Sequence, residues 1–218
     1  MFYIGMIEDD LAEASSVMLS LVVNAEQIDD NSFKLYELEK KQNFREKLLE
    51  QILNDIKENK IQGLIVDYKL DTLDEVLEGI EVVDYLHELV PEFPVIILTN
   101  VPEKSKENDK ADPDKVYAKE IFMKPDAVGT KEMVYCIVRN LTRYTKRRAE
   151  LEIKREQILN NVVEAKEYDN ESYGQLLEIE RELSRFVPIE MTAIDAAYNM
   201  KNMEEALEAL KAYKSLLE

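Results

Sequence analysis

Acidic side chains that could hold a metal ion occur at two places in the first third of the chain. Glu8, Asp9 and Asp10 follow the first apolar run, and Asp67 lies near the end of the third. Carboxylates that are packed together repel one another unless a cation joins them, and their hard oxygen ligands suit Mg²⁺. An aspartate that faces such an ion can attack phosphorus and form an acyl phosphate. These residue types therefore predict phosphoryl chemistry at Asp67 beside Mg²⁺.

A hydroxyl group and an ammonium group follow two later apolar runs. Thr99 ends the run that begins at Pro94, and Lys124 comes directly after Ile121–Met123. A phosphoryl group in transfer spreads its charge over three equatorial oxygens, so that metal, ammonium and hydroxyl groups can all stabilise it. We expect Thr99 to supply the hydroxyl and Lys124 the ammonium.

The elements that would position these side chains are short apolar runs alternating with amphipathic segments. The runs are Phe2–Ile7, Phe33–Leu38, Gly63–Tyr68, Pro94–Thr99 and Ile121–Met123. Helical periodicity is clear between residues 44 and 56 and between residues 80 and 90. This alternation predicts an α/β fold, doubly wound, with a five-stranded parallel sheet. In such a sheet the carboxyl ends of the strands meet at one edge, where the acidic, hydroxyl and ammonium groups would converge.

The remainder of the chain, from about residue 143 to 218, shows helical patterns and no strand pattern. Apolar residues seven apart at Ile137, Tyr144, Leu151, Ile158 and Ala165 predict that the last helix of the α/β part continues past residue 150. A second helix is predicted over 171–187 and a last one after Asn202. The resulting all-α region has apolar stripes that could pack on each other or form a homodimer.

Five sequence motifs occur in a recognisable order. They are IEDD at 7–10, IVDYKL at 65–70, EGIEVVDYL at 78–86, PVIILTN at 94–100 and FMKP at 122–125. In order and approximate spacing, residues 1–142 resemble the receiver domain of two-component response regulators, which has a flavodoxin-like fold. The division that follows is a receiver domain over 1–142 and a helical output or dimerisation region over 143–218.

The resemblance implies a role for each matching residue. Asp67 corresponds to the phosphoacceptor, and Thr99 and Lys124 to the residues that bind the phosphoryl group. Asp9 resembles the direct ligand of Mg²⁺ and Glu8 a ligand of its water shell, with Asp67 and the backbone carbonyl of Lys69 completing the metal site. The bond before Pro125 is typically cis in the family.

Two positions differ from the family pattern. Asn100 stands where a small residue is usual, and Ile121 stands where an aromatic switch residue is usual, three before Lys124. The coupling between Thr99 and a rotating aromatic ring would therefore be altered in this chain.

The resemblance implies a phosphoprotein of two-component signal transduction (a phosphorelay). A sensor histidine kinase would phosphorylate Asp67, and the change would reach an unknown downstream protein through the fourth helix, fifth strand and fifth helix. We find no catalytic motif after residue 142, so any enzymatic activity would be the receiver's own phosphorylation and dephosphorylation. The alternative is a receiver-like scaffold or adaptor protein that is never phosphorylated.

Composition restricts the other function classes. The formal net charge of −18 argues against a nucleic-acid partner, because such partners need clustered basic residues. No apolar run is long enough to cross a membrane, and one cysteine, Cys136, allows no internal disulfide, so we expect a cytoplasmic protein. We also expect Cys136 to be a buried thiol, His87 a helix-surface histidine, and Lys119 a solvated charge. The basic residues Arg143, Lys146, Arg147, Arg148, Lys154 and Arg155 are predicted to form a solvated helix face.

Overall fold

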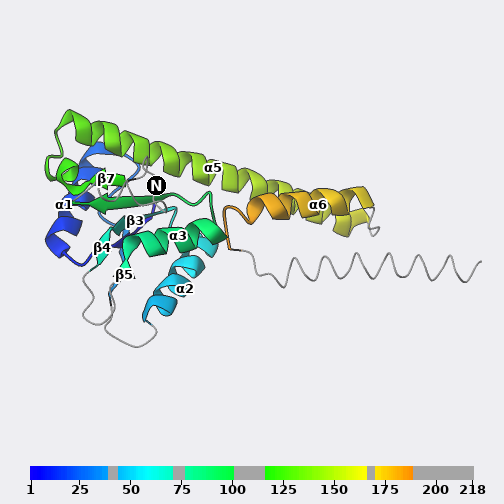
Figure 1. Ribbon diagram of the computed structural model, residues 1–218. Coiled ribbons are helices and arrows are strands. Elements are labelled where there is room, and N and C mark those ends of the chain that lie inside the picture. The colour runs from blue at the N-terminus through cyan, green and yellow to red at the C-terminus, as the bar shows by residue number, and fades with distance from the viewer. Residues whose placement is uncertain (39–43, 71–76, 101–115, 166–169, 189–218) are drawn as a thin grey trace, which may run out of the picture.

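A five-stranded parallel sheet forms the centre of the molecule, as the computed structural model shows for residues 1–38, 44–70, 77–100, 116–165 and 170–188 (Figure 1). Its strands are β1 (Ile4–Ile7), β2 (Phe33–Leu35), β3 (Gly63–Asp67), β6 (Val95–Thr99) and β7 (Val116–Ala118). They lie in the order β2-β1-β3-β6-β7, and a small antiparallel hairpin of β4 (Lys69–Leu70) and β5 (Leu77–Glu78) follows β3. The prediction of an α/β protein with a five-stranded parallel sheet is confirmed.

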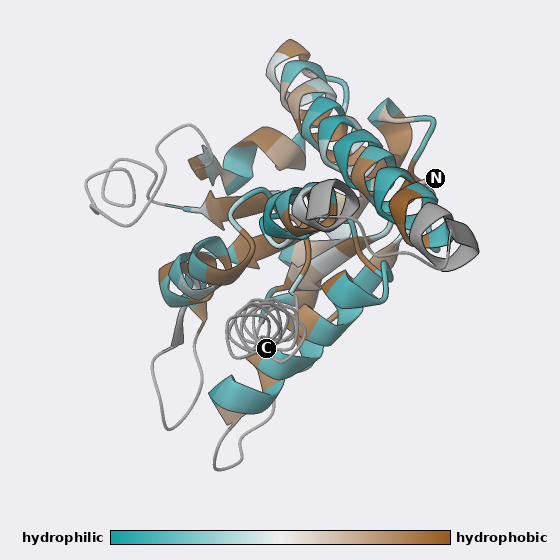
Figure 2. Ribbon diagram, turned by 90° about the vertical axis from the view of Figure 1, so that its right-hand side faces the viewer, coloured by the Kyte–Doolittle hydropathy of each residue, from teal (hydrophilic) through white to brown (hydrophobic). Residues whose placement is uncertain are grey.

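Helices pack against both faces of the sheet, because the side chains of each strand alternate between two hydrophobic cores. The first core joins the strands to α2 (Phe44–Lys57) and α3 (Gly79–Leu89). The second joins them to α1 (Leu11–Asn24) and to the first part of α5 (Val128–Ala165). One row of the first core crosses four strands in register and consists of Ile7, Val66, Ile97 and Val116. Figure 2 shows the same division, with hydrophobic residues concentrated in the strands and hydrophilic residues on the outer faces of the helices.

The fifth strand of the sheet is not where the sequence predicted it. Residues Val116–Ala118 pair with β6, with Thr99 opposite Ala118, whereas the run from Ile121 to Met123 belongs to a 3₁₀ helix, η2 (Lys119–Met123). The run was misread as a strand because it is the more apolar of the two segments. Its central residue, Phe122, lies in a helical turn, and its side chain is nevertheless fully buried.

The prediction that the last helix continues past residue 150 is confirmed, since α5 reaches Ala165. The proposed domain boundary after residue 142 therefore falls inside one unbroken helix. Ile137, Tyr144 and Leu151 are all buried. Cys136 is exposed, contrary to the expectation of a buried thiol, because it precedes Ile137 on the helix and lies on the outward side of this stripe.

The second half of α5 packs against α6 (Asn170–Leu183) and the turn that follows it, beside the segment that leads into β6. The ring of Tyr144 makes an edge-to-face contact with Phe93 at 5.4 Å and stacks on Phe186 at 5.9 Å. Its hydroxyl donates a hydrogen bond of 2.9 Å to the carbonyl oxygen of Phe186. The backbone amide of Glu92 donates to the carbonyl of Arg185, whose side chain binds the Glu92 carboxylate at 2.7 Å. We call Phe93, Tyr144 and Phe186 the aromatic cluster.

The basic segment of α5 is not uniformly solvated, contrary to the prediction. Arg148 is only 5% exposed, and its guanidinium donates to the carbonyl oxygens of Ile56 and Lys57 at 2.7 and 3.0 Å. These carbonyls belong to the last turn of α2, where helix carbonyls lack intrahelical partners. Arg148 therefore caps α2 from a distant part of the chain. Arg147 binds Glu182 of α6, and Arg155 binds Glu180.

Two helices predicted from the sequence lie outside the described residues. They are the fourth helix, which would fall within 101–115, and the last helix after Asn202. The second helix of the C-terminal region is described as α6, which ends at Leu183 and is followed by a turn, whereas the prediction extended it to 187. Within the described part of the chain, no helix is long and apolar enough to cross a membrane.

Candidate functional site

The carboxylates predicted to bind a metal ion come together at the carboxyl ends of β1 and β3. Glu8 and Asp9 directly follow β1, and Asp67 is the last residue of β3. One carboxylate oxygen of each lies within 4.8 Å of the others. Glu8 and Asp67 are buried, whereas Asp9 is exposed. Since Mg²⁺ takes a few carboxylates and keeps several waters, this donor set fits that ion, with Asp9 on the open side.

Asp10, the third acidic residue of the motif, has a structural role. It is the N-cap of α1, and its carboxylate accepts hydrogen bonds from the amides of Ala12 and Glu13 at 2.8 and 3.1 Å. The backbone amide of Asp10 donates to Glu8 Oε1 at 3.2 Å. The start of α1 therefore fixes the direction in which the Glu8 carboxylate faces.

The ammonium group beside these carboxylates belongs to Lys119, the first residue after β7. Its Nζ lies 2.8 Å from Glu8 Oε2, 2.9 Å from Asp67 Oδ2 and 2.5 Å from Glu13 Oε2. The side chain is 2% exposed, so the expectation that Lys119 is a solvated charge is wrong. Three carboxylates use all three of its N–H donors, which is what permits an ammonium group to be buried here.

Lys124 does not occupy the position that the sequence predicted for it. It is exposed, lies at the C-terminal end of η2, and forms no ion pair with the residues that the structure describes. Its carbonyl accepts a hydrogen bond of 2.7 Å from the Thr130 hydroxyl, which tethers the loop to α5. No peptide bond among the described residues is cis, so the bond before Pro125 is trans. The error followed from placing the fifth strand at Ile121–Met123, which put the wrong lysine at the edge of the sheet.

The protonation of the site is governed by burial. Burial raises the pKa of Glu8 to about 7, against the lowering effect of Lys119 and with a further upward contribution from the Asp67 charge. Burial likewise raises the pKa of Asp67, opposed by Lys119 and by the backbone amide of Lys69, which donates to the Asp67 carboxylate. Burial alone would lower the pKa of Lys119, but its hydrogen bonds to Glu13, Glu8 and Asp67 outweigh burial and raise that pKa. Without a metal ion, the site thus holds a charged lysine and a Glu8 carboxyl that titrates near neutrality.

Thr99 and Lys69 also lie at this edge of the sheet. Thr99 is the last residue of β6, as the sequence predicted, and its side chain is buried. Lys69 is in β4, two residues beyond Asp67, with its amide directed to the Asp67 carboxylate. The β4–β5 hairpin brings Gly79 so close that a Cβ there would lie 1.9 Å from the carbonyl oxygen of Asp67. Gly79 therefore allows α3 to begin directly against the candidate site.

Sequence reasoning missed two residues of the site, Lys119 and Glu13. Lys119 follows a three-residue strand, which is too short to show a clear pattern. Glu13 lies three residues after the N-cap Asp10, a spacing that by itself indicates a capping box. Nothing in the sequence connects it with a lysine 106 positions away.

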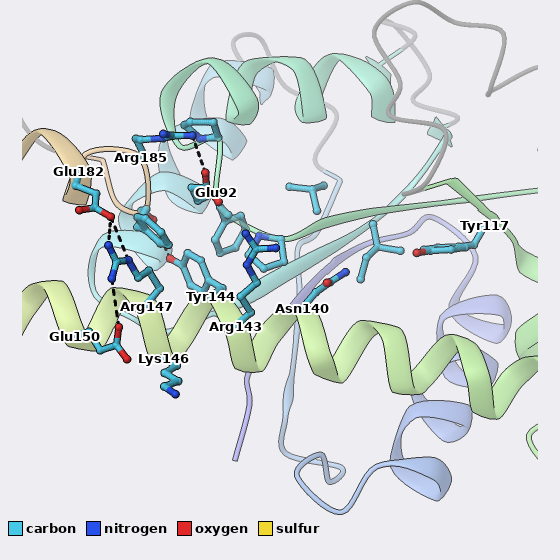
Figure 3. Close-up of a pocket in the computed structure, with 16 residues that line it drawn as sticks. Glu92, Tyr117, Asn140, Arg143, Tyr144, Lys146, Arg147, Glu150, Glu182 and Arg185 are labelled. Atoms are coloured by element: carbon cyan, nitrogen blue, oxygen red, sulfur yellow. Dashed lines mark hydrogen bonds and ion pairs between the residues drawn. The ribbon is translucent and has the colours of Figure 1, made fainter.

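A separate cleft lies away from these carboxylates. It has a volume of about 560 Å³ and is lined by α5, the end of α6 and residues 91–96 (Figure 3). Arg143, Tyr144 and Arg147 line it from α5, and Glu182 and Arg185 from the other side. It borders the aromatic cluster and includes none of the carboxylates around Lys119, so we place the candidate chemistry at the acidic cluster.

Comparison with protein-family models, with curated proteins and with solved structures finds no match. The function of this chain therefore has to be inferred from its own residues.

Proposed function

We propose that this protein is a response regulator whose Asp67 accepts a phosphoryl group from a sensor histidine kinase with Mg²⁺ bound. The observation that carries the proposal is the meeting of Glu8, Asp67 and Lys119, which follow or end three different strands at one edge of the sheet. Numbered along the sheet's own strands, the order is 2-1-3-4-5, which is that of flavodoxin-like folds. This order supports the likeness of residues 1–142 to a receiver domain, with Lys119 in place of Lys124 as the phosphate-binding lysine.

Glu8, Asp9 and Asp67 would hold the metal ion, with the Lys69 carbonyl as a further candidate ligand. When bound, Mg²⁺ would neutralise charge on the carboxylates and on the phosphoryl oxygens. Its arrival would also favour the ionised form of Glu8, whose pKa of about 7 leaves it partly protonated at neutral pH.

The transfer itself needs one nucleophilic oxygen. A carboxylate oxygen of Asp67 attacks the phosphorus of a phosphohistidine, the new P–O bond forms as the P–N bond breaks, and the imidazole leaves with the electron pair. Lys119 then exchanges its contact with Asp67 for one with a phosphoryl oxygen, and the Thr99 hydroxyl donates to another. Three before Lys119 stands Val116, so the position of the usual aromatic switch residue is again aliphatic.

The output of such a signal would run through α5, which begins just after the segment of residues 119–125 and packs against α6. The Ser20 hydroxyl donates to the Phe122 carbonyl, and the Asn24 amide donates to the Pro125 carbonyl at 2.9 Å. The Thr130 hydroxyl binds the same loop from α5. A shift of Lys119 toward a phosphoryl group would therefore act on α1 and α5 together, and through α5 on a downstream protein that binds the helical region.

The test is phosphorylation by a small-molecule phosphodonor in the presence of Mg²⁺, followed by intact-mass spectrometry. The wild type should gain one phosphoryl group, Asp67→Asn should gain none, and the exposed-residue control Asp30→Asn should behave as the wild type. Absence of a mass gain in the wild type, together with no binding of beryllofluoride, would refute phosphorylation at Asp67.

A second candidate function is a scaffold or adaptor that is never phosphorylated. It is favoured by the saturation of Lys119 with three carboxylates, which gives the site a complete set of ion pairs without any ligand. Calorimetric titration with Mg²⁺ separates the two functions, since a scaffold has no need of the ion. Heat of binding that disappears in Asp9→Asn would favour the response regulator.

A further inference from the structure

We propose that Glu13 is a positioning residue that holds the ammonium group of Lys119 against the phosphoryl group on Asp67. The inference rests on the proposed function and adds a carboxylate that the resemblance does not supply. Its basis is the contact of 2.5 Å between Glu13 Oε2 and Lys119 Nζ, the shortest of the three that the lysine makes.

Glu13 is available for this contact because Glu8 accepts the backbone hydrogen bond that a glutamate at this helix position usually accepts. In a capping box, the glutamate three residues after the N-cap accepts the backbone N–H of the N-cap residue. Here that N–H, from Asp10, is directed to Glu8 Oε1 at 3.2 Å. The Glu13 carboxylate is turned to Lys119 instead, on a side chain that is 26% exposed.

Glu13 also differs from the other two partners of Lys119 in what a ligand would do to it. Glu8 and Asp67 belong to the group of carboxylates that could hold a metal ion, and Glu13 does not. Metal binding and phosphorylation would draw Glu8 and Asp67 into other bonds. Glu13 would then remain as the carboxylate dedicated to the lysine, keeping a long and flexible side chain in the geometry that a phosphoryl oxygen requires.

The first experiment measures the affinity for beryllofluoride with Mg²⁺ present, by calorimetry, in the wild type and in Glu13→Gln. The variant should bind about five- to tenfold more weakly, as expected for the loss of a partly exposed charge-assisted hydrogen bond. The matched control is Glu46→Gln, which removes an exposed glutamate from the first turn of α2 and should have no effect. In a Lys119→Met background, Glu13→Gln should cause no further loss, because the residue acts through the lysine.

The second experiment measures the acylation rate of Lys119 by peptide mapping in the presence of Mg²⁺ and without any phosphoryl mimic. Glu13→Gln should raise this rate about tenfold relative to that of the exposed Lys131, since the ammonium loses its retaining partner. This arm reports on the lysine alone, and circular dichroism confirms that each variant is folded.

The outcomes separate the two proposals. If the wild type binds beryllofluoride and Glu13→Gln binds it equally well or more tightly, the positioning role is overturned and the proposed function stands. If the wild type does not bind it, the proposed function fails and the phosphoryl role of Glu13 fails with it. Faster acylation of Lys119 in the variant would in that case assign Glu13 to the ion-pair cluster only.

Discussion

The two ends of the central sheet are built from opposite kinds of interaction. At the carboxyl ends of the strands, Lys119 is enclosed by three carboxylates, two of them with raised pKa values. At the other end, the aromatic cluster joins α5 and the turn after α6 to the segment before β6. The first end contains buried charges that a cation or a proton would stabilise, whereas at the second the Tyr144 hydroxyl and the Arg148 guanidinium have hydrogen-bond acceptors.

This difference separates what the two ends contribute. A buried ion pair adds little net stability, because the loss of hydration offsets the attraction between the charges. Burying aromatic surface, by contrast, stabilises the fold directly. The helix α5 runs from one end to the other (Figure 1). If the aromatic cluster holds α5 rigidly, a movement of its first turns at the acidic end would move the rest of the helix as well. The predictions that follow test whether stability resides at the aromatic end and ligand response at the acidic end.

The largest effect is expected from Tyr144→Ala. The substitution removes a buried ring from the aromatic cluster together with its hydrogen bond to Phe186, and should lower the free energy of unfolding by about 4 kcal/mol. Urea denaturation measures it, with Tyr135→Ala on the exposed face of the same helix as the control. The control should change stability by no more than about 0.5 kcal/mol. Equal losses in both variants would show that α5 is not anchored through Tyr144.

The next largest effect is expected from Lys119→Met. Removing the ammonium leaves Glu8, Glu13 and Asp67 without their shared cation. The free energy of unfolding should therefore fall by about 3 kcal/mol at pH 8. Mg²⁺ should restore much of this loss, because it can neutralise the same carboxylates, and it should bind the variant more tightly than the wild type. Thermal melting with and without Mg²⁺ makes the measurement. Lys124→Met is the control and should leave the melting temperature unchanged, whereas an equal loss in that variant would assign the wrong lysine.

A smaller effect is expected from Arg148→Ala. The carbonyl groups of Ile56 and Lys57 lose the hydrogen bonds from the Arg148 guanidinium, and the free energy of unfolding should fall by about 2 kcal/mol. Arg143→Ala, on the exposed side of α5, is the matched control. Hydrogen exchange in the last turn of α2 should become faster in Arg148→Ala alone. Unchanged exchange there would mean that the cap does not stabilise α2.

The last prediction concerns the pH dependence of stability to which Glu8 contributes. Its pKa in the folded protein, about 7, lies above the value of 4.5 for an unperturbed glutamate. A carboxyl with a raised folded pKa stabilises the fold fully below its unfolded pKa, and this contribution is lost as pH rises through 7. Metal-free wild type should therefore lose stability between pH 5 and pH 8, and Glu8→Gln should lose less. Identical pH profiles for the two proteins would show that Glu8 ionises normally.

The location of the acidic site was predictable because it depends on short-range features of the sequence. Glu8, Asp9 and Asp67 stand at or just after the ends of strongly apolar runs, and parallel strands place such positions at one edge. The run Gly63–Asp67 is buried along its whole length, so its pattern was clear. The second half of α5 was predictable for a similar reason, since its heptad spacing persists over several turns.

Which lysine lies beside the carboxylates was decided only by the tertiary structure. Two lysines follow apolar segments near the end of the sheet, and local sequence favoured Lys124 after the more apolar run. The pairing of Leu98 with Tyr117 and Thr99 with Ala118 puts Lys119 next to the site, and the burial of Phe122 in a 3₁₀ turn carries Lys124 away. The roles of Glu13 and Arg148 have the same origin, because each acts on a group about a hundred positions away, where a local pattern carries no information. The apolar pattern of the sequence thus determined the helices and strands and placed the acidic residues at one edge of the sheet. Strand register determined which lysine lies beside them.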